Sequence, residues 1–249
     1  MTTQRGIEMN VTQEKHWKDS RWLITGGSSG LGLALARELD RLGARVVVVA
    51  RNKGRLQEAI QGSNIHPITA DVSAKDDVYR VIGEASAFLG GIDVLVNNAS
   101  ALGPTPLRLL SDTECEDLSL VFETNLMGPF RWTKAALSSM LLRQKGLIIN
   151  ISSDAAQSAY PTWGPYSASK AALDHLTRVW QQELNAEGIQ FVAVDPGDMD
   201  TPMHLAAIPD ADRTALYKPD EVATDLLHFL TTLPKEQPVR YSASEWRTS

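Results

Sequence analysis

Thr25-Gly26-Gly27-Ser28-Ser29-Gly30-Leu31-Gly32 is the stretch that decides the fold of this 249-residue chain. It follows a short apolar run, and Leu31, Leu35 and Leu39 then recur at the spacing of one helix face, up to Gly43. Glycines permit a tight turn and let backbone amides approach a pyrophosphate. The N-terminus of the following helix adds unpaired N–H groups and a partial positive charge. This context predicts a phosphate-binding loop, with a glycine-rich turn that holds no ligand as the alternative.

The rest of the chain alternates between apolar runs and helical patterns. Nearly continuous apolar runs stand at 46–49, 94–96, 147–149 and 191–194, as in parallel strands covered on both faces. Such alternation predicts an α/β fold, a Rossmann-like doubly wound parallel sheet in three α/β/α layers. Residues 1–20 are polar and aperiodic, so we expect a flexible N-terminal extension before a single catalytic domain of residues 21–249.

Composition excludes several classes of protein. Hydrophobic residues make up 43% and charged residues 22%, which is ordinary for a globular protein with a full core. A net charge of -6 without a long basic run argues against a nucleic-acid partner, and no apolar stretch approaches the roughly 20 residues that span a bilayer. Cys115 is the only cysteine, which fits a cytoplasmic location, and His175 and His204 lack the spacing of metal ligands.

A tyrosine and a lysine stand four residues apart, in Tyr166-Ser167-Ala168-Ser169-Lys170. On a helix this spacing places both side chains on one face. A nearby ammonium favours the phenolate, so we expect Lys170 to lower the pKa of Tyr166. Lowering it by about 3 units takes roughly 4 kcal/mol of differential interaction. The pair is therefore a candidate acid/base centre, and a solvated helix face is the alternative.

A long helical pattern from about Asp112 to Arg143 is interrupted by Gly128 and Pro129. Proline at position i offers no N–H to the carbonyl at i−4, which here belongs to Asn125. We therefore expect a kink, and a freed Asn125 carbonyl able to hold an ordered water. An ordinary proline kink without a functional role is the alternative.

Taken together, the T-G-x-x-x-G-x-G spacing and Y-x-x-x-K pair resemble the short-chain dehydrogenase/reductase family. The resemblance implies a catalytic tetrad of Asn125, Ser153, Tyr166 and Lys170, because the family's serine stands 13 residues before its tyrosine. Ser153 would bind the substrate oxygen, and Asn125 would hold a water that contacts the lysine. Chemistry alone does not separate Ser153 from its neighbour Ser152.

The resemblance also implies a set of cofactor contacts. Asn97-Asn98-Ala99-Ser100 resembles the family's N-N-A-G motif, with Ser100 in place of glycine, and 196–201 resembles its P-G-x-x-x-T segment. The implied cofactor-binding residues are Gly26, Ser28, Ser29, Gly30, Leu31, Gly32, Arg51, Asn52, Asp71, Val72, Asn98, Ala99, Ser100, Tyr166, Lys170, Pro196, Gly197, Met199 and Thr201. The end of the chain departs from the family's V-D-G-G segment and reads Pro238-Val239-Arg240-Tyr241 instead, so the usual C-terminal subunit contact is not implied.

The residues after the second strand select the cofactor. An acidic residue there would bind both adenosine ribose hydroxyls and repel a 2′-phosphate. This chain has Ala50-Arg51-Asn52, and Arg51 offers a guanidinium fork to a phosphate, so NADP(H) is favoured over NAD(H). A surface arginine without a ligand is the alternative.

These patterns predict an NADP(H)-dependent oxidoreductase that acts on a small-molecule carbonyl or secondary alcohol, running as a carbonyl reductase. Two other hypotheses remain: an NAD-dependent alcohol dehydrogenase on the same scaffold, and a nucleotide-sensing protein without turnover. The resemblance implies a homodimer or homotetramer assembled through the helices that carry Asn125 and Tyr166. Tyr160 and Trp163 are expected either to line the substrate pocket or to pack in the core.

Overall fold

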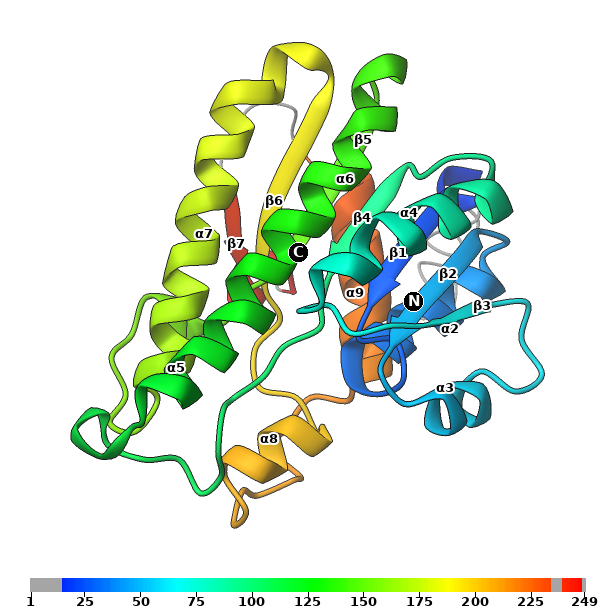
Figure 1. Cartoon of the computed structure of the whole chain (residues 1–249). Coiled ribbons are helices and arrows are strands. Elements are labelled where there is room, and N and C mark those ends of the chain that lie inside the picture. The colour runs from blue at the N-terminus through cyan, green and yellow to red at the C-terminus, as the bar shows by residue number, and fades with distance from the viewer. Residues whose placement is uncertain (1–14, 234–238, 248–249) are drawn as a thin grey trace.

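A computed structural model describes residues 15–233 and 239–247. Its centre is a seven-stranded parallel sheet in the order β3-β2-β1-β4-β5-β6-β7 (Figure 1). The strands are β1 (Arg21–Thr25), β2 (Arg45–Ala50), β3 (His66–Thr69), β4 (Val94–Asn97), β5 (Gly146–Ile151), β6 (Ile189–Asp195) and β7 (Arg240–Ser242). All six pairings are parallel, so the predicted Rossmann-like doubly wound sheet is confirmed.

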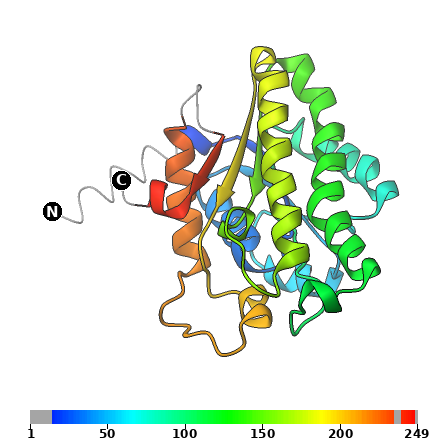
Figure 2. The same cartoon turned by 90° about the vertical axis from the view of Figure 1, so that its left-hand side faces the viewer.

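Helices cover both faces of the sheet and complete the three predicted layers. The helices are α2 (Gly30–Arg41), α3 (Lys53–Ala59), α4 (Lys75–Leu89), α5 (Cys115–Phe122), α6 (Gly128–Arg143), α7 (Gly164–Leu184), α8 (Pro202–Ala207), α9 (Pro219–Thr231) and α10 (Ala243–Trp246). One core lies between the sheet and α2 with α9, and includes Leu31, Leu35 and Leu39. The other lies between the sheet and α4 with α6 (Figure 2). In the described ranges, no helix has both the length and the apolar character needed to cross a membrane.

The strand order places the functional loops together. The chain runs outward from β1 to β2 and β3, then returns to the other side of β1 with β4, so the order reverses between β1 and β4. In parallel sheets a crevice opens at that point, beyond the carboxyl ends of the strands. The glycine loop leaves β1 there, Asn98 follows β4, and Ser152 follows β5.

The expected interruption between α5 and α6 is present as a π turn, Glu123–Met127. The Gly128 N–H donates to the Glu123 carbonyl, five residues back, and Pro129 stands in the first turn of α6. Proline cannot donate to the carbonyl at i−4, so the wider turn accommodates it without ending the helix. Asn125 is fully buried at the centre of this turn.

The predicted N-terminal extension needs correction at its C-terminal end. Residues 1–14 lie outside the described residues, but Trp17 is buried in the core. Its indole Nε1 donates to the Leu227 carbonyl on α9 at 3.3 Å, and its ring packs edge-on against Trp22 at 5.1 Å. Trp17 is a single large apolar side chain among polar neighbours and gives no periodic signal. The sequence pattern therefore predicted that this segment belongs to the flexible extension.

Asp93 ties the amino-terminal edge of the sheet together, on the side away from the crevice. Its carboxylate lies 2.5 Å from Arg21 Nη2 and 2.7 Å from Arg143 Nη1. Burial alone would raise the pKa of Asp93, but the hydrogen bonds from Arg21 and Arg143 lower it to about 2. A carboxyl group whose pKa is depressed on folding stabilises the protein above its unfolded-state pKa, and this contribution is lost as the pH falls toward the folded-state pKa.

We therefore expect Asp93→Asn to lower the free energy of unfolding by about 2 kcal/mol near pH 7, at 1.36 kcal/mol per pKa unit. The gap between variant and parent should narrow as the pH falls from about 4 toward 2, because the parent carboxylate becomes protonated there. Urea unfolding followed by tryptophan fluorescence at several pH values measures the gap. A gap that is independent of pH would contradict the assignment of this stability to the Asp93 charge.

Candidate active site

A cavity of about 610 Å³ opens at the carboxyl edge of the sheet, a volume typical of a small-molecule site. Most of the predicted site residues line it: Gly26, Ser28, Ser29, Gly30, Leu31, Arg51, Asp71, Val72, Asn98, Ala99, Ser100, Ser153, Tyr166, Lys170, Pro196, Gly197, Met199 and Thr201. Gly32, Asn52 and Asn125 are not among the lining residues. Asn52 instead caps α3 by accepting a hydrogen bond from the Arg55 N–H at 2.9 Å.

Gly26 and Gly32 of the glycine loop are packed too closely for a side chain. Gly26 has a φ of 71°, and a Cβ there would lie 2.8 Å from Asn98 Nδ2. A Cβ on Gly32 would lie 2.5 Å from the same atom and 2.6 Å from the Gly26 carbonyl oxygen. Gly32 therefore serves the packing of α2 against the loop, while Gly26 lines the cavity. No described side chain caps the N-terminus of α2, so its first N–H groups face the loop unshielded.

Thr25 begins the glycine-loop stretch but was not among the predicted cofactor-binding residues, and it joins the loops after β1 and β4. Its Oγ1 accepts from the backbone N–H groups of Asn98 at 3.0 Å and Ala99 at 3.1 Å, and donates to the Val96 carbonyl. The Asn98 side chain returns a hydrogen bond to the Thr25 carbonyl at 2.9 Å. These bonds hold Asn98 and Ala99 beside the glycine loop at the cavity wall.

Two arginines stand at the end of the cavity next to β2. Arg51 follows Ala50 directly, and Arg55 lies one helical turn further on, in α3. Arg51 lies 4.0 Å from Asp71, and its side chain is 75% exposed, so it remains accessible to an anion. The sequence predicted Arg51 and missed Arg55. The four-residue spacing of the two arginines at a helix start was the available signal.

Tyr166 and Lys170 lie on one face of α7, and both are buried. The Lys170 ammonium donates to the Ile151 carbonyl at 2.7 Å and lies 5.5 Å from the centre of the Tyr166 ring. Burial lowers the pKa of Lys170 to about 8, although the Asp174 carboxylate acts in the opposite direction. Burial also raises the pKa of Tyr166 to about 12, against hydrogen bonds with Ser153 and Ser100.

The expected lowering of the Tyr166 pKa is not what the structure shows, because the pKa of this phenol is raised. The Lys170 ammonium is directed at a strand carbonyl, and the loss of water around the phenol is the largest influence on the pKa of Tyr166. With its pKa raised to about 12, Tyr166 is protonated at neutral pH and is able to donate a proton.

Ser153 stands where β5 gives way to a short helix, Asp154–Ala156. Its hydroxyl accepts from the Ala155 N–H at 3.2 Å and donates to the Asp154 carboxylate at 2.9 Å. Asp154 in turn accepts from the Tyr160 hydroxyl at 2.6 Å. The Ser152 hydroxyl, by contrast, is buried without a hydrogen-bond partner among the described residues. Of the two serines, Ser153 is the one whose hydroxyl acts on the pKa of Tyr166, and it lowers that pKa.

Asn125 lies behind the cavity wall and organises it from the π turn. Its amide oxygen accepts from Ser100 Oγ at 3.1 Å and from the Ala101 N–H at 2.8 Å. Its amide nitrogen donates to the Ala101 carbonyl and to Ser169 Oγ, at 2.9 and 3.0 Å. Ser100, which replaces the family's glycine, thus bonds to Asn125 and also lowers the pKa of Tyr166.

The remaining cavity wall is largely apolar and aromatic. Tyr160 and Trp163 both line it, and the Trp163 ring meets Tyr166 edge-on at 5.6 Å. The segment around α8 supplies Met203, His204 and Ile208, with Asp198 3.6 Å from His204 Nδ1. The described residues contain no group of three or more His, Cys, Asp or Glu side chains that could hold a metal ion.

Known proteins resemble this chain in sequence and in architecture. The family model "short chain dehydrogenase" matches residues 21–211. An uncharacterized oxidoreductase of Staphylococcus aureus is 31% identical over 212 residues, covering 84% of this chain and 90% of that protein. A short chain dehydrogenase of Pseudocercospora fijiensis is 35% identical over 207 residues, covering 79% of this chain and 64% of that protein.

Solved structures agree with the sequence relatives. A short-chain dehydrogenase from Streptomyces avermitilis superposes with a TM-score of 0.78 at 27% identity, covering 92% of this chain and 90% of that one. A dehydrogenase/reductase from Sinorhizobium meliloti gives 0.77 at 27% identity, covering 91% and 96%. The predicted family is confirmed: this chain belongs to the short-chain dehydrogenase/reductase family of oxidoreductases, which use a nicotinamide dinucleotide.

Proposed function

We propose that the protein is an NADP(H)-dependent carbonyl reductase. The observation that carries this proposal is the pair of cavity-lining arginines, Arg51 and Arg55, beside Ala50 at the end of β2. The loop offers a 2′-phosphate two guanidinium groups and no carboxylate at position 50, where one would repel it. If the cell holds NADPH reduced, the reaction runs toward the alcohol.

The cavity fits such a cofactor in three ways. Gly26 lines the cavity where a pyrophosphate would lie, and the N-terminus of α2 offers unshielded N–H groups beside it. Arg51 and Arg55 would hold the 2′-phosphate, and the 196–201 segment would hold the nicotinamide carboxamide. When bound, the nicotinamide supplies the hydride.

Residues of the chain would bind the carbonyl oxygen and transfer a proton to it. Ser153 would donate a hydrogen bond to the carbonyl oxygen in place of its present bond to Asp154. Tyr166, protonated at neutral pH, would donate its phenolic proton to that oxygen as negative charge develops there. Lys170 would favour the resulting phenolate, and Asn125 would hold the water that returns a proton to this centre.

An NADPH-oxidation screen tests the proposal. Ketones, aldehydes, quinones and keto esters are offered in turn, and loss of NADPH absorbance is followed with the parent protein. Turnover of at least one carbonyl class with NADPH supports the proposal. Turnover only as alcohol oxidation with NAD would favour the alternative dehydrogenase. Tight NADPH binding without turnover would favour a nucleotide sensor.

We also propose a cytoplasmic location, supported by the single, exposed Cys115.

We further propose a homodimer or homotetramer assembled through α5, α6 and α7. These helices expose Leu118, Leu120, Leu142 and Val179, a set of apolar side chains that a partner subunit would cover. We expect static light scattering to give two or four times the 27.2 kDa chain mass at micromolar concentration. Leu120→Arg, which places a charge on this face, should shift the protein toward monomer. A parent that is only monomeric would contradict the assembly.

A further inference from the structure

The last strand brings an arginine to the active site. β7 pairs with β6 in parallel, with Arg240 opposite Ala193. Tyr241 points to the α9 side of the sheet, where its ring meets Phe229 edge-on at 4.7 Å. Because successive side chains of a strand point to opposite faces, Arg240 points toward α7. Its side chain is only 11% exposed.

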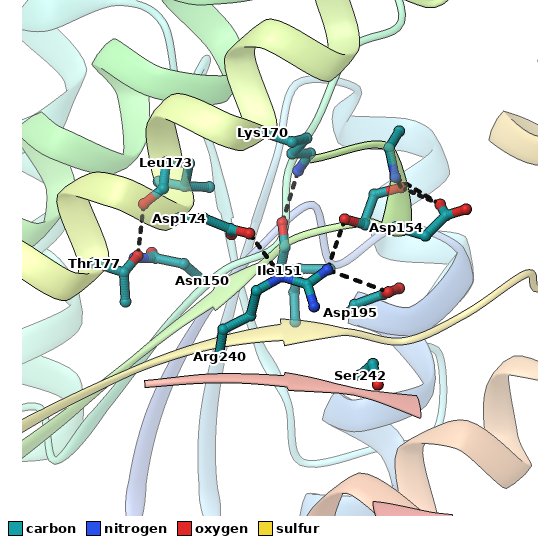
Figure 3. A network of polar contacts seen from close by, with 12 residues as sticks. Asn150, Ile151, Asp154, Lys170, Leu173, Asp174, Thr177, Asp195, Arg240 and Ser242 are labelled. Carbon is teal, nitrogen blue, oxygen red and sulfur yellow. Dashed lines mark hydrogen bonds and ion pairs between the residues drawn. The ribbon is translucent and has the colours of Figure 1, made fainter. Parts of the chain in front are cut away.

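Arg240 has three partners, and each belongs to a different element (Figure 3). Its Nε donates to Asp174 Oδ2 on α7 at 2.8 Å. Its Nη2 donates to the Ser153 main-chain carbonyl at 3.0 Å and lies 3.4 Å from Asp195 Oδ2 at the end of β6. The Asp174 and Asp195 side chains are 5% and 9% exposed. One guanidinium therefore joins two buried carboxylates to the backbone of Ser153.

The two carboxylates act on the acid/base pair. Asp174 lies one helical turn after Lys170 and raises the pKa of that ammonium, while Asp195 raises the pKa of Tyr166. Without Arg240, both carboxylates would stay buried with no arginine beside them, and the other Asp174 oxygen already lacks a partner among the described residues. An uncompensated buried charge is costly and shifts the pKa values of its neighbours.

The other charged groups around this centre do not take over the role of Arg240 in balancing Asp174 and Asp195. Asp154, in the helix after Ser153, adds a further negative charge near Tyr166 and Asp195. On the opposite side of α7, Asp117 of α5 lies 4.0 Å from Arg108, and Glu123 of the π turn lies 2.7 Å from Arg131. Glu116 of α5 and Glu187, in the turn after α7, are exposed.

We propose that Arg240 is a positioning residue for the reductase: it fixes the main chain at Ser153 and neutralises Asp174 and Asp195 beside Lys170 and Tyr166. This inference rests on the proposed function for its effect on turnover. It gives a role to the C-terminal segment in which this chain departs from its family. It also makes β7, at the edge of the sheet, part of the support of the active site.

Arg240→Met separates this role from simple packing. We expect kcat for the best carbonyl substrate to fall about 10- to 100-fold, because Ser153 is no longer held in place, with little change in the NADPH dissociation constant. The pKa of Lys170 should rise by about one unit, because the Asp174 charge is no longer compensated. Nuclear magnetic resonance of isotope-labelled lysine reads this pKa without turnover, and Lys170→Met identifies the resonance.

Two further variants separate the effect of the Arg240 charge from the effect of its contacts. Arg240→Lys keeps a positive charge but not the three-way contact, so it should lower kcat and leave the Lys170 pKa near its parent value. Asp174→Asn combined with Arg240→Met removes the uncompensated charge. This double variant should return the Lys170 pKa toward the parent value without restoring kcat.

Arg143→Met is the matched control. Arg143 also joins a carboxylate, Asp93, to main-chain carbonyls, those of Ser139 and Ile92, but at the opposite edge of the sheet. It should lower the melting temperature without changing kcat or the Lys170 pKa. If Arg240→Met behaves in the same way, Arg240 is only structural and the proposal is overturned.

The variants distinguish a failure to fold from a failure of the proposed function. If Arg240→Met does not fold, Arg240→Lys decides: a lowered kcat at an unchanged Lys170 pKa supports the proposal, and parental kcat overturns it. If the parent reduces no carbonyl, the proposed function fails. The Lys170 titration then still tests whether Arg240 compensates Asp174.

Discussion

Replacing Tyr166 with phenylalanine is expected to lower kcat for carbonyl reduction by about 10²–10⁴-fold, the usual contribution of a positioned general acid. The ring, its burial and its edge-on contact with Trp163 are retained, so the change removes the phenolic proton and little else. The pKa of Tyr166, which burial raises to about 12, keeps that proton in place at neutral pH in the parent. Stopped-flow measurement of NADPH oxidation under single-turnover conditions isolates the chemical step.

Tyr79→Phe is a suitable control, because Tyr79 is an exposed tyrosine on α4, away from the cavity-lining residues. Its variant should turn over at the parental rate. NADPH binding, measured by quenching of tryptophan fluorescence, should be similar in both variants and the parent. Near-parental turnover by a folded Tyr166→Phe protein would remove Tyr166 from the role of acid.

Combining Ala50→Asp with Arg51→Ala is expected to reverse the cofactor preference. A charge-assisted hydrogen bond contributes about 1.5–3 kcal/mol, so one or two of them give the parent about 10- to 1,000-fold preference for NADP(H). The exposure of Arg51 and its proximity to Asp71 favour the low end of this range. The carboxylate introduced at position 50 would repel the 2′-phosphate and accept from the ribose hydroxyls of NAD(H).

The ratio of kcat/KM for the two cofactors measures this preference in the parent, each single variant and the double variant. Arg55→Ala should reduce the preference further if both arginines hold the phosphate. Arg80→Ala, at a surface arginine paired with Asp77 on α4, should leave the ratio unchanged. A parent that prefers NAD(H), or a ratio indifferent to positions 50 and 51, would show that Arg51 is a surface residue only.

Much of this architecture could be predicted from local sequence pattern. Buried parallel strands need continuous apolar runs, and β2 and β5 carry such runs, so the fold followed from composition and order. The interruption at Asn125 was predicted from one proline, because Pro129 offers no N–H to the carbonyl four residues before it, whereas its form as a π turn was not predicted. The tetrad positions followed from a resemblance, and their catalytic roles remain predictions.

The features that could not be predicted from the sequence depend on contacts between segments that are distant along the chain. Trp17 is buried by α9, 210 residues away from it in sequence, and no local pattern marks such a contact. The direction of the Tyr166 pKa shift depends on how much water the fold removes from the phenol, which only the packed structure shows. Arg240 meets Asp174 only because β7 is added at the edge of the sheet.

During synthesis on the ribosome, Arg240 is added well after the other residues of the candidate active site. Ser153, Tyr166 and Lys170 emerge first, and Arg240 follows Lys170 by about 70 residues, which corresponds to roughly 4–14 s at 5–20 residues per second. During that interval Asp174 and Asp195 have no arginine to pair with, and burying them is unfavourable. Under the proposed function, the nascent chain would complete its active site only once β7 has joined the sheet, so activity would wait until Arg240 has been translated.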